Sequence, residues 1–179
     1  MKLITVSGPP SSGKTAVLLK LIAHLQVQHK TAGVIKFDCL YANEAQQFAR
    51  IQVPVKVGLS GNLCPDHFFV SNISDGLGWG QEQQFDYFFT ESAGLCNRCS
   101  PHIKNVRAIC VIDNLMGMET PKKIGPMLRL ADIVVITKSD IVSQAEREVF
   151  AFRVRQANAK ATILFVNGIN GQGTFELSR

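Results

Sequence analysis

Residues Gly8 to Thr15 read Gly-Pro-Pro-Ser-Ser-Gly-Lys-Thr, the complete G-x-x-x-x-G-K-[ST] pattern of a phosphate-binding loop. The sequence predicts a strand directly before this loop and a helix directly after it. Backbone N–H groups of such a loop surround a phosphate at a helix N-terminus, where the helix dipole favours negative charge. Lys14 would reach the β- and γ-phosphates, and the Thr15 hydroxyl would bind Mg²⁺. The motif therefore predicts nucleotide binding by Gly8, Pro9, Pro10, Ser11, Ser12, Gly13, Lys14 and Thr15.

Short apolar segments alternate with helical patterns along the rest of the chain. Strands are predicted at 3–7, 31–37, 53–57, 87–90, 108–112, 133–137 and 162–166, and helices at 15–28, 43–50, 124–130 and 143–157. This alternation indicates βαβ units, and continuous apolar strands are typical of parallel sheets covered on both faces. We expect an α/β fold with a mainly parallel central sheet flanked by helices on both faces, forming a single P-loop domain over residues 1–179. The glycine-rich stretch 75–80 predicts a mobile loop.

Composition and charge exclude several classes of protein. The chain has 179 residues, of which 46% are hydrophobic and 18% charged, as in globular proteins. No apolar run approaches the roughly 20 residues of a membrane helix, and the sequence enters its first predicted strand without a signal-peptide pattern. The net charge of +5 is not gathered into a stripe. We expect a cytoplasmic protein that binds neither membranes nor nucleic acid.

Acidic residues follow two of the predicted strands. Asp38 comes after the second strand, and Glu91 after the strand at 87–90. Ligands of an open α/β sheet bind at the carboxyl ends of its strands. Either carboxylate could hold Mg²⁺ or orient a water near the γ-phosphate, and a solvated acid is the alternative. Lys14, Asp38 and Glu91 are thus the predicted catalytic residues, whereas for Asp113, after another strand, a solvated acid is an equally good interpretation.

The predicted strand at 133–137 leads into Thr137-Lys138-Ser139-Asp140, which resembles the [NT]-K-x-D element of GTPases. In that element the Asp accepts two hydrogen bonds from guanine, and the Lys stem lies along the base. Adenine lacks this donor pair, so Asp140 would be left unpaired in the complex with the wrong nucleotide. The motif favours GTP over ATP, with Thr at the position where Asn is the other choice.

Two pairs of soft ligands suggest a metal site. Cys96 and Cys99 have C-x-x-C spacing, which lets two thiolates grip one ion from a tight turn. Cys64 and His67 are predicted in another loop at the same edge of the sheet. Together the four could bind Zn²⁺ or Ni²⁺, or three cysteines could hold an iron–sulfur cluster. Ordinary thiols and a solvent-facing histidine are the alternatives, and the two remaining cysteines are predicted core residues.

The ordered set of motifs resembles SIMIBI-class GTPases of the nickel-metallochaperone group, which contains the urease accessory and hydrogenase maturation GTPases. The resemblance covers essentially the whole chain and rests on residues 8–15, Asp38, 53–58, 64–67, 91–94, 120–126, 137–140 and 166–173. It implies that Asp38 and Glu91 assist Mg²⁺ and catalysis. It also implies that Glu91-x-x-Gly94 is the switch II segment and that residues 166–173, with Asn167 and Gly168, pass under the guanine.

The same resemblance implies a GTP-binding and GTP-hydrolysing metallochaperone that forms a homodimer with GTP. Such a protein would deliver nickel or zinc to a client metalloenzyme or accessory maturation protein. The sequence departs from the group in having Cys64-Pro-Asp-His67 for its Cys-Pro-His or Cys-His pair, and in placing Cys96-Asn-Arg-Cys99 in switch II. The alternatives are an ATP-dependent iron–sulfur or nickel carrier, a small-molecule P-loop kinase, and a binding module without enzyme activity.

Overall fold

Seven parallel strands form one sheet in the computed structural model, which describes residues 1–39, 45–96 and 98–179. The strands follow the order β3-β2-β4-β1-β5-β6-β7. Their bounds are β1 (Lys2–Ser7), β2 (Ala32–Asp38), β3 (Val55–Leu59), β4 (Tyr87–Ser92), β5 (Arg107–Asp113), β6 (Ile133–Thr137) and β7 (Thr162–Phe165). All seven predicted strands are confirmed to within about two residues, because most of them are continuous apolar runs of the kind that a doubly covered sheet requires.

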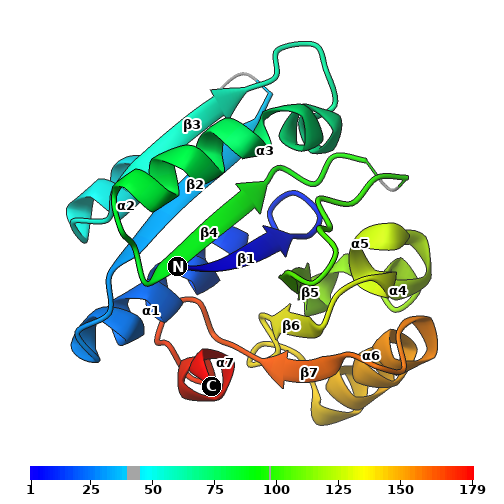
Figure 1. Cartoon of the computed structure of the whole chain (residues 1–179). Coiled ribbons are helices and arrows are strands. Elements are labelled where there is room, and N and C mark those ends of the chain that lie inside the picture. Colours follow the sequence, from blue (N-terminus) through cyan, green and yellow to red (C-terminus); the bar gives the residue numbers. More distant parts are fainter. Residues whose placement is uncertain (40–44, 97) are drawn as a thin grey trace.

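Helices cover both faces of this sheet (Figure 1). The helices are α1 (Lys14–Val27), α2 (Ala45–Arg50), α3 (Pro65–Glu82), α4 (Thr120–Lys123), α5 (Pro126–Arg129), α6 (Gln144–Ala157) and α7 (Thr174–Ser178), with a 3₁₀ turn at Asn114–Met116. Apolar residues of α1, α2 and α7 share one core cluster with the sheet. On the other face, α3 packs in one cluster over β2 and β4, and α5 and α6 form another over β5 and β6.

The register of the strands brings their carboxyl ends to one edge. Glu91 of β4 pairs with Val6 of β1 and with Lys36 of β2, and Asp113 of β5 pairs with Thr137 of β6. The loop that follows β1 therefore lies between the ends of β4 and β5, the two strands that neighbour β1. This placement gathers the predicted site residues around the phosphate-binding loop.

The loop predicted at 75–80 is wrong, because these residues belong to the long helix α3. Their glycines let the helix lie close to the sheet. A Cβ atom on Gly76 would come within 2.8 Å of Ile35 Cδ1, and one on Gly80 within 3.1 Å of Phe88 Cγ. Close packing on the sheet outweighs the low helix propensity of glycine.

Two other predictions are wrong, and a third is confirmed only for the described residues. The helix predicted at 124–130 is only the short turn α5, because Gly125 at φ 74° separates it from the turn α4 that precedes the predicted range. The helix predicted at 43–50 is seen as α2 from Ala45, and residues 43 and 44 lie outside the described part of the chain. His67, predicted in a loop, lies in the first turn of α3, and Cys64 is the N-cap of that helix.

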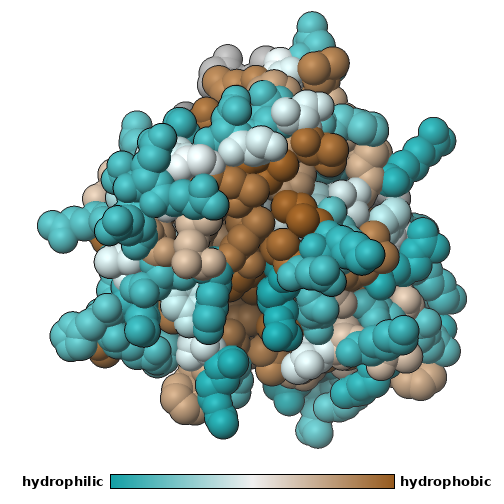
Figure 2. Space-filling view, in the orientation of Figure 1, coloured by the Kyte–Doolittle hydropathy of each residue, from teal (hydrophilic) through white to brown (hydrophobic). Residues whose placement is uncertain are grey.

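Apolar side chains gather in a strip on the face of the molecule seen in Figure 1. Figure 2 shows it running down the middle of this face, between α3 and the group of α4, α5 and α6. Among the described residues, no helix is both long and apolar enough to cross a membrane.

Candidate nucleotide and metal site

The phosphate-binding loop connects β1 to α1, as its sequence predicts. Gly13 is the N-cap of α1 with a left-handed φ of 92°, and Lys14 is the first residue of the helix. The Lys14 ammonium is buried and donates to the main-chain oxygens of Gly8 and Pro9, each at 2.9 Å. Burial lowers the pKa of Lys14, an effect that the nearby Glu91 carboxylate opposes. Phosphate oxygens would offer this ammonium stronger, charge-assisted acceptors than the two carbonyls.

Thr15 and Glu91 meet directly at the start of α1. The Thr15 hydroxyl donates to Glu91 Oε1 at 2.6 Å, and the Oε2 oxygen of Glu91 is buried without a hydrogen-bond partner among the described residues. A hydroxyl beside a carboxylate with an unused oxygen is the oxygen donor set that Mg²⁺ takes in nucleotide sites. The residues present therefore fit the predicted ion.

Lys36 is part of the same cluster, although none of the sequence motifs predicted it. Its ammonium lies 2.7 Å from Glu91 Oε1 and 3.4 Å from Thr15 Oγ1, and the residue is only 4% exposed. A lysine within the apolar run of β2 was the available signal, because a charged residue in a doubly covered strand is rarely buried without a partner.

The other two strand-end acids have different surroundings. Asp38 is half-buried at the end of β2, and its Oδ1 oxygen accepts from the N–H of Cys39 at 2.8 Å. Asp113 accepts from the N–H of Leu115 at 2.7 Å and also pairs with the Lys138 ammonium. Asp113 thus caps the 3₁₀ turn after β5 and holds Lys138, so it is not a solvated acid.

The predicted guanine element is joined to the phosphate-binding loop. The Thr137 hydroxyl donates to the main-chain oxygen of Ser12 at 2.7 Å, and the Lys138 ammonium donates to that of Ser11 at 3.3 Å. Next to them, Asn167 Nδ2 donates to Asp140 Oδ2 at 3.0 Å. A cavity of about 80 Å³ lies between Asp140, Asn167, Phe165 and Arg147. Asp140 keeps one carboxylate oxygen without a partner in these contacts.

Gly168 brings the segment after β7 against α1. A Cβ atom at this position would lie 2.9 Å from the Ala16 Cβ atom, so the chain passes the start of α1 at close range. Asn167 also accepts from the N–H groups of Ile169 and Asn170 at 2.8 and 3.1 Å. The segment predicted to pass under the base is therefore a tight turn beside the loop.

The segment Glu91-x-x-Gly94 touches the phosphate-binding loop. Gly94 has φ 70°, and a Cβ atom on it would come within 1.8 Å of the Gly8 oxygen. The Lys14 ammonium also reaches the Ala93 oxygen at 3.4 Å. A phosphate that draws Lys14 away from these carbonyls would therefore act on this segment directly.

Three thiols and one imidazole meet beyond that segment. The sulfur atoms of Cys64, Cys96 and Cys99 lie within 4.8 Å of one another. Cys96 Sγ is 3.3 Å from Cys99 Sγ, which in turn is 3.6 Å from His67 Nε2. The four side chains come from the N-terminus of α3 and from the β4–β5 connection, so the structure brings the two predicted pairs together.

The two cysteines of the C-x-x-C pair have opposite pKa shifts. The N–H of Arg98 donates to Cys96 Sγ, and together with the Cys99 thiol it lowers the pKa of Cys96. Burial and the neighbouring Cys96 sulfur raise the pKa of Cys99 to about 12. Cys96 therefore gives up its proton more readily than Cys99, and a bound cation would favour the thiolate form of both.

Asp66 is a second residue that the sequence analysis did not single out. It is 1% exposed, and its Oδ1 oxygen accepts from the Ser92 hydroxyl, whereas Oδ2 is buried without a partner among the described residues. Burial raises the pKa of Asp66. Ser92 follows Glu91 in β4, and successive side chains of a strand point to opposite faces. Glu91 thus faces Thr15 and α1, while Ser92 faces Asp66 and α3.

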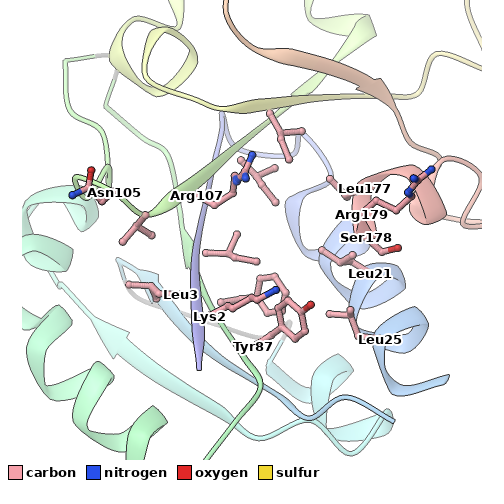
Figure 3. A pocket seen from close by; sticks show the side chains of 15 residues that line it. Lys2, Leu3, Leu21, Leu25, Tyr87, Asn105, Arg107, Leu177, Ser178 and Arg179 are labelled. Carbon is pink, nitrogen blue, oxygen red and sulfur yellow. The ribbon is translucent and has the colours of Figure 1, made fainter. Parts of the chain in front are cut away.

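The remaining cysteines and a large apolar cavity lie apart from this chemistry. Cys110 is fully buried, as predicted, and burial raises its pKa to about 12, whereas Cys39 is half-buried. A cavity of about 510 Å³ opens where the strands begin, with Leu21, Leu25 and Leu177 inside it and Lys2, Arg107 and Arg179 around it (Figure 3). None of its lining residues belongs to the phosphate-binding loop.

Residues 2–165 match a protein family described as CobW/HypB/UreG, nucleotide-binding domain. The chain is 46% identical over its 179 residues to an uncharacterized protein of Methanocaldococcus jannaschii, of which it covers 76%. The family match agrees with the resemblance that the sequence motifs indicate.

Solved structures share the fold at low sequence identity. The hydrogenase maturation factor HypB of Archaeoglobus fulgidus has a TM-score of 0.78 at 17% identity, over 99% of this chain and 87% of that one. HypB of Helicobacter pylori, in complex with nickel, has a TM-score of 0.78 at 16% identity, over 99% and 84%. FlhF, complexed with GMPPNP and Mg²⁺, has a TM-score of 0.70 at 19% identity, over 99% and 74%. These likenesses confirm the predicted α/β fold of a P-loop protein.

Proposed function

The chain belongs to the CobW/HypB/UreG family of nucleotide-binding domains, and from that premise we propose a GTP-hydrolysing metallochaperone. The proposal covers residues 1–179 as one P-loop GTPase domain, cytoplasmic in location, with GTP and Mg²⁺ as cofactors. Its cargo is a transition metal, nickel or zinc, for a client metalloenzyme or accessory maturation protein. One observation carries it: β4 holds Glu91 against the phosphate-binding loop and leads, four residues beyond its end, into the thiol cluster.

The nucleotide half of the proposal rests on exchangeable contacts. Lys14 now donates to backbone carbonyls, and phosphate oxygens would replace them as acceptors. Thr15 and Glu91, with Asp38 nearby in the sheet, would hold Mg²⁺, which neutralises the charge that develops on the phosphates. We expect slow intrinsic hydrolysis. The cationic side chains in contact with the phosphate-binding loop or Glu91 are lysines, whereas an arginine finger increases the rate of related reactions by about 10³–10⁵-fold.

Guanine selection is assigned to Asp140. Asn167 holds one of its carboxylate oxygens, so the carboxylate is fixed at the mouth of the small cavity beside Phe165. Isothermal calorimetry with Mg²⁺·GTP and Mg²⁺·ATP tests this assignment. Asp140→Ala should weaken GTP binding by about 2–4 kcal/mol, as loss of a charge-assisted pair of hydrogen bonds would, and leave ATP binding nearly unchanged. Asp75→Ala, on the exposed side of α3, is the matched control, and equal wild-type affinity for both nucleotides would refute guanine selection.

The metal half rests on the four ligands. Three thiolates and an imidazole give S₃N coordination, which suits Zn²⁺ and also offers Ni²⁺ a thiolate-rich site. The structure of Helicobacter pylori HypB with nickel supports a nickel cargo for a protein of this fold. Metal content by mass spectrometry after loading with Zn²⁺ or Ni²⁺ tests the site. Cys96→Ser with Cys99→Ser should abolish stoichiometric binding, and Cys39→Ser, half-buried outside the cluster, should retain it.

Coupling between the two sites follows from their shared strand. Glu91 contacts the nucleotide half, and the adjacent Ser92 holds Asp66, which lies two residues from Cys64. A coupling of about 1–3 kcal/mol between sites would change metal affinity by about 5–150-fold between nucleotide states. By linkage, metal must then tighten GTP by the same factor. Affinity for Zn²⁺ measured with GDP, with a non-hydrolysable GTP analogue and without nucleotide decides the matter, and three identical values would refute the coupling.

Exposed leucines beside the cluster support a GTP-dependent homodimer. Leu63 precedes Cys64 and is 63% exposed, and Leu95 precedes Cys96 and is 56% exposed. A second copy covering these side chains would also close the metal site. Sedimentation with the GTP analogue and Zn²⁺ should show a dimer, and Leu63→Glu should weaken it.

A further inference from the structure

Lys36 places a buried positive charge inside the proposed magnesium site. It lies in β2 directly beside Glu91 of β4, because the two residues are register partners in adjacent parallel strands. Both side chains point to the face that α1 covers, and their ion pair has side-chain exposures of 5% and 1%. Burying an ion pair removes two charges from water, and a well-packed apolar pair is often as stable. Stability alone is therefore a poor reason for this pair.

The ammonium contacts the same two side chains that the metal ion would use. It contacts Glu91 Oε1 at 2.7 Å and Thr15 Oγ1 at 3.4 Å, and the hydroxyl of Thr15 itself donates to Glu91 Oε1. Mg²⁺ requires oxygen ligands at about 2.0–2.1 Å in near-ideal octahedral geometry. The Oε2 oxygen of Glu91 has no hydrogen-bond partner among the described residues, but an ion bound there would still lie close to the Lys36 ammonium. Like charges repel strongly in a buried site, so the pairing of Lys36 with Glu91 opposes the binding of a divalent cation.

We propose that the Lys36 ammonium is a built-in competitor of Mg²⁺, which holds Thr15 and Glu91 until Mg²⁺ arrives together with a nucleotide. The negative charge of the phosphates compensates the two positive charges of Mg²⁺ beside the Lys36 ammonium. Without a nucleotide this compensation is missing, so free Mg²⁺ does not bind at the site. Lys36 is in this sense a positioning residue for Glu91 and sets the order of binding. The inference rests on the nucleotide site of the proposed function.

The test compares the magnesium dependence of the wild type with that of three variants. Lys36→Met removes the charge, Lys36→Gln keeps a neutral donor for Glu91, and Lys30→Met makes the same change at an exposed lysine beyond α1. Thermal unfolding is followed during titration with MgCl₂ in the absence of nucleotide. GDP affinity is then measured by calorimetry from excess EDTA to millimolar Mg²⁺, so that neither readout depends on hydrolysis.

We expect Mg²⁺ alone to leave the melting temperature of the wild type and of Lys30→Met unchanged, and to raise that of Lys36→Gln and Lys36→Met. The Mg²⁺ concentration at half-maximal GDP affinity should fall by about 10- to 100-fold in both Lys36 variants, the size expected when a competing charged hydrogen bond is removed. Should Lys36→Met fail to fold, Lys36→Gln alone decides. An unchanged Mg²⁺ dependence in a folded Lys36 variant would overturn the inference, whereas failure of the wild type to bind any guanine nucleotide would instead overturn the proposed function.

Discussion

The hydroxyl of Thr137 donates a hydrogen bond of 2.7 Å to the main-chain oxygen of Ser12, across 125 residues of sequence. This contact fixes the end of β6 against the phosphate-binding loop. The side chain is 3% exposed and also reaches the Ile112 oxygen at 3.2 Å. Threonine at the first position of the T-K-x-D element therefore has a structural role, because its hydrogen bond fixes the position of β6 relative to the phosphate-binding loop.

Removing that hydroxyl should loosen the loop. Thr137→Val keeps the shape of the side chain but leaves the buried Ser12 oxygen without its donor, so the free energy of unfolding should fall by about 1–3 kcal/mol. GTP affinity should fall with it, because the loop loses its fixed position. Urea denaturation and calorimetry measure the two effects. Thr137→Ser retains the donor and is the control, and a valine variant as stable as the wild type would show that the contact is dispensable.

Gly94 links the switch segment to the phosphate loop, and its substitution should separate them. Gly94→Ala would place a Cβ atom 1.8 Å from the Gly8 oxygen, a backbone atom that cannot move aside without displacing the loop. Gly61→Ala is a matched control, since Gly61 also has a left-handed φ of 59° but nothing lies within 4 Å of its would-be Cβ. We expect Gly61→Ala to lower the free energy of unfolding by about 1–2 kcal/mol through strain alone.

Gly94→Ala should lower the free energy of unfolding more than Gly61→Ala does. It should also weaken nucleotide binding, which Gly61→Ala leaves intact. Chemical denaturation and GDP calorimetry on both variants check the difference. If the two alanine variants lose the same stability and keep the same GDP affinity, the contact between switch segment and loop has no effect on the nucleotide site.

Asp66 predicts a pH dependence with a definite sign. Burial raises the pKa of its carboxyl group, while Ser92, Lys14 and His67 oppose this shift. Between the unfolded and the folded pKa the native state binds more protons than the unfolded state, so stability falls as the pH rises through that window. Asp66→Asn cannot ionise and should flatten the decline. Denaturation curves from pH 4 to pH 8 measure it, and parallel curves for the two proteins would contradict the prediction.

The sequence predicted the individual residues of the site better than the contacts between them. The phosphate loop, Glu91 and the two cysteine pairs could be found because each has a local pattern of residues. Lys36 has a local signal, a charge within an apolar run, but its pairing with Glu91 depends on the register between β2 and β4, which no local pattern contains. Asp66 was missed for a similar reason: its partner Ser92 lies 26 residues away on a strand that faces α3.

The glycine-rich stretch of α3 shows why local propensity failed there. Three glycines in five residues predict a loop, but two of them lie where the helix meets Ile35 and Phe88 of the sheet. Tertiary packing decides such cases, because a helix can approach a sheet closely only where it lacks side chains. The third glycine, Gly78, has nothing within 4 Å of its would-be Cβ and therefore has no such role.

This difference gives a matched pair of substitutions in one helix. Gly78→Ala should raise the free energy of unfolding by about 0.5–1 kcal/mol, because alanine loses less backbone entropy in a helix and meets no neighbour. Gly80→Ala gains the same propensity but would place its Cβ atom 2.9 Å from Met1 Sδ and 3.1 Å from Phe88 Cγ. The Phe88 ring is fully buried in the core under α3, so the helix must shift away from the sheet. Overpacking of this kind costs about 1–3 kcal/mol, so Gly80→Ala should be destabilised overall. Urea denaturation of both variants provides the comparison, and a Gly80→Ala protein as stable as Gly78→Ala would mean that the glycine at position 80 is not required for the packing of α3.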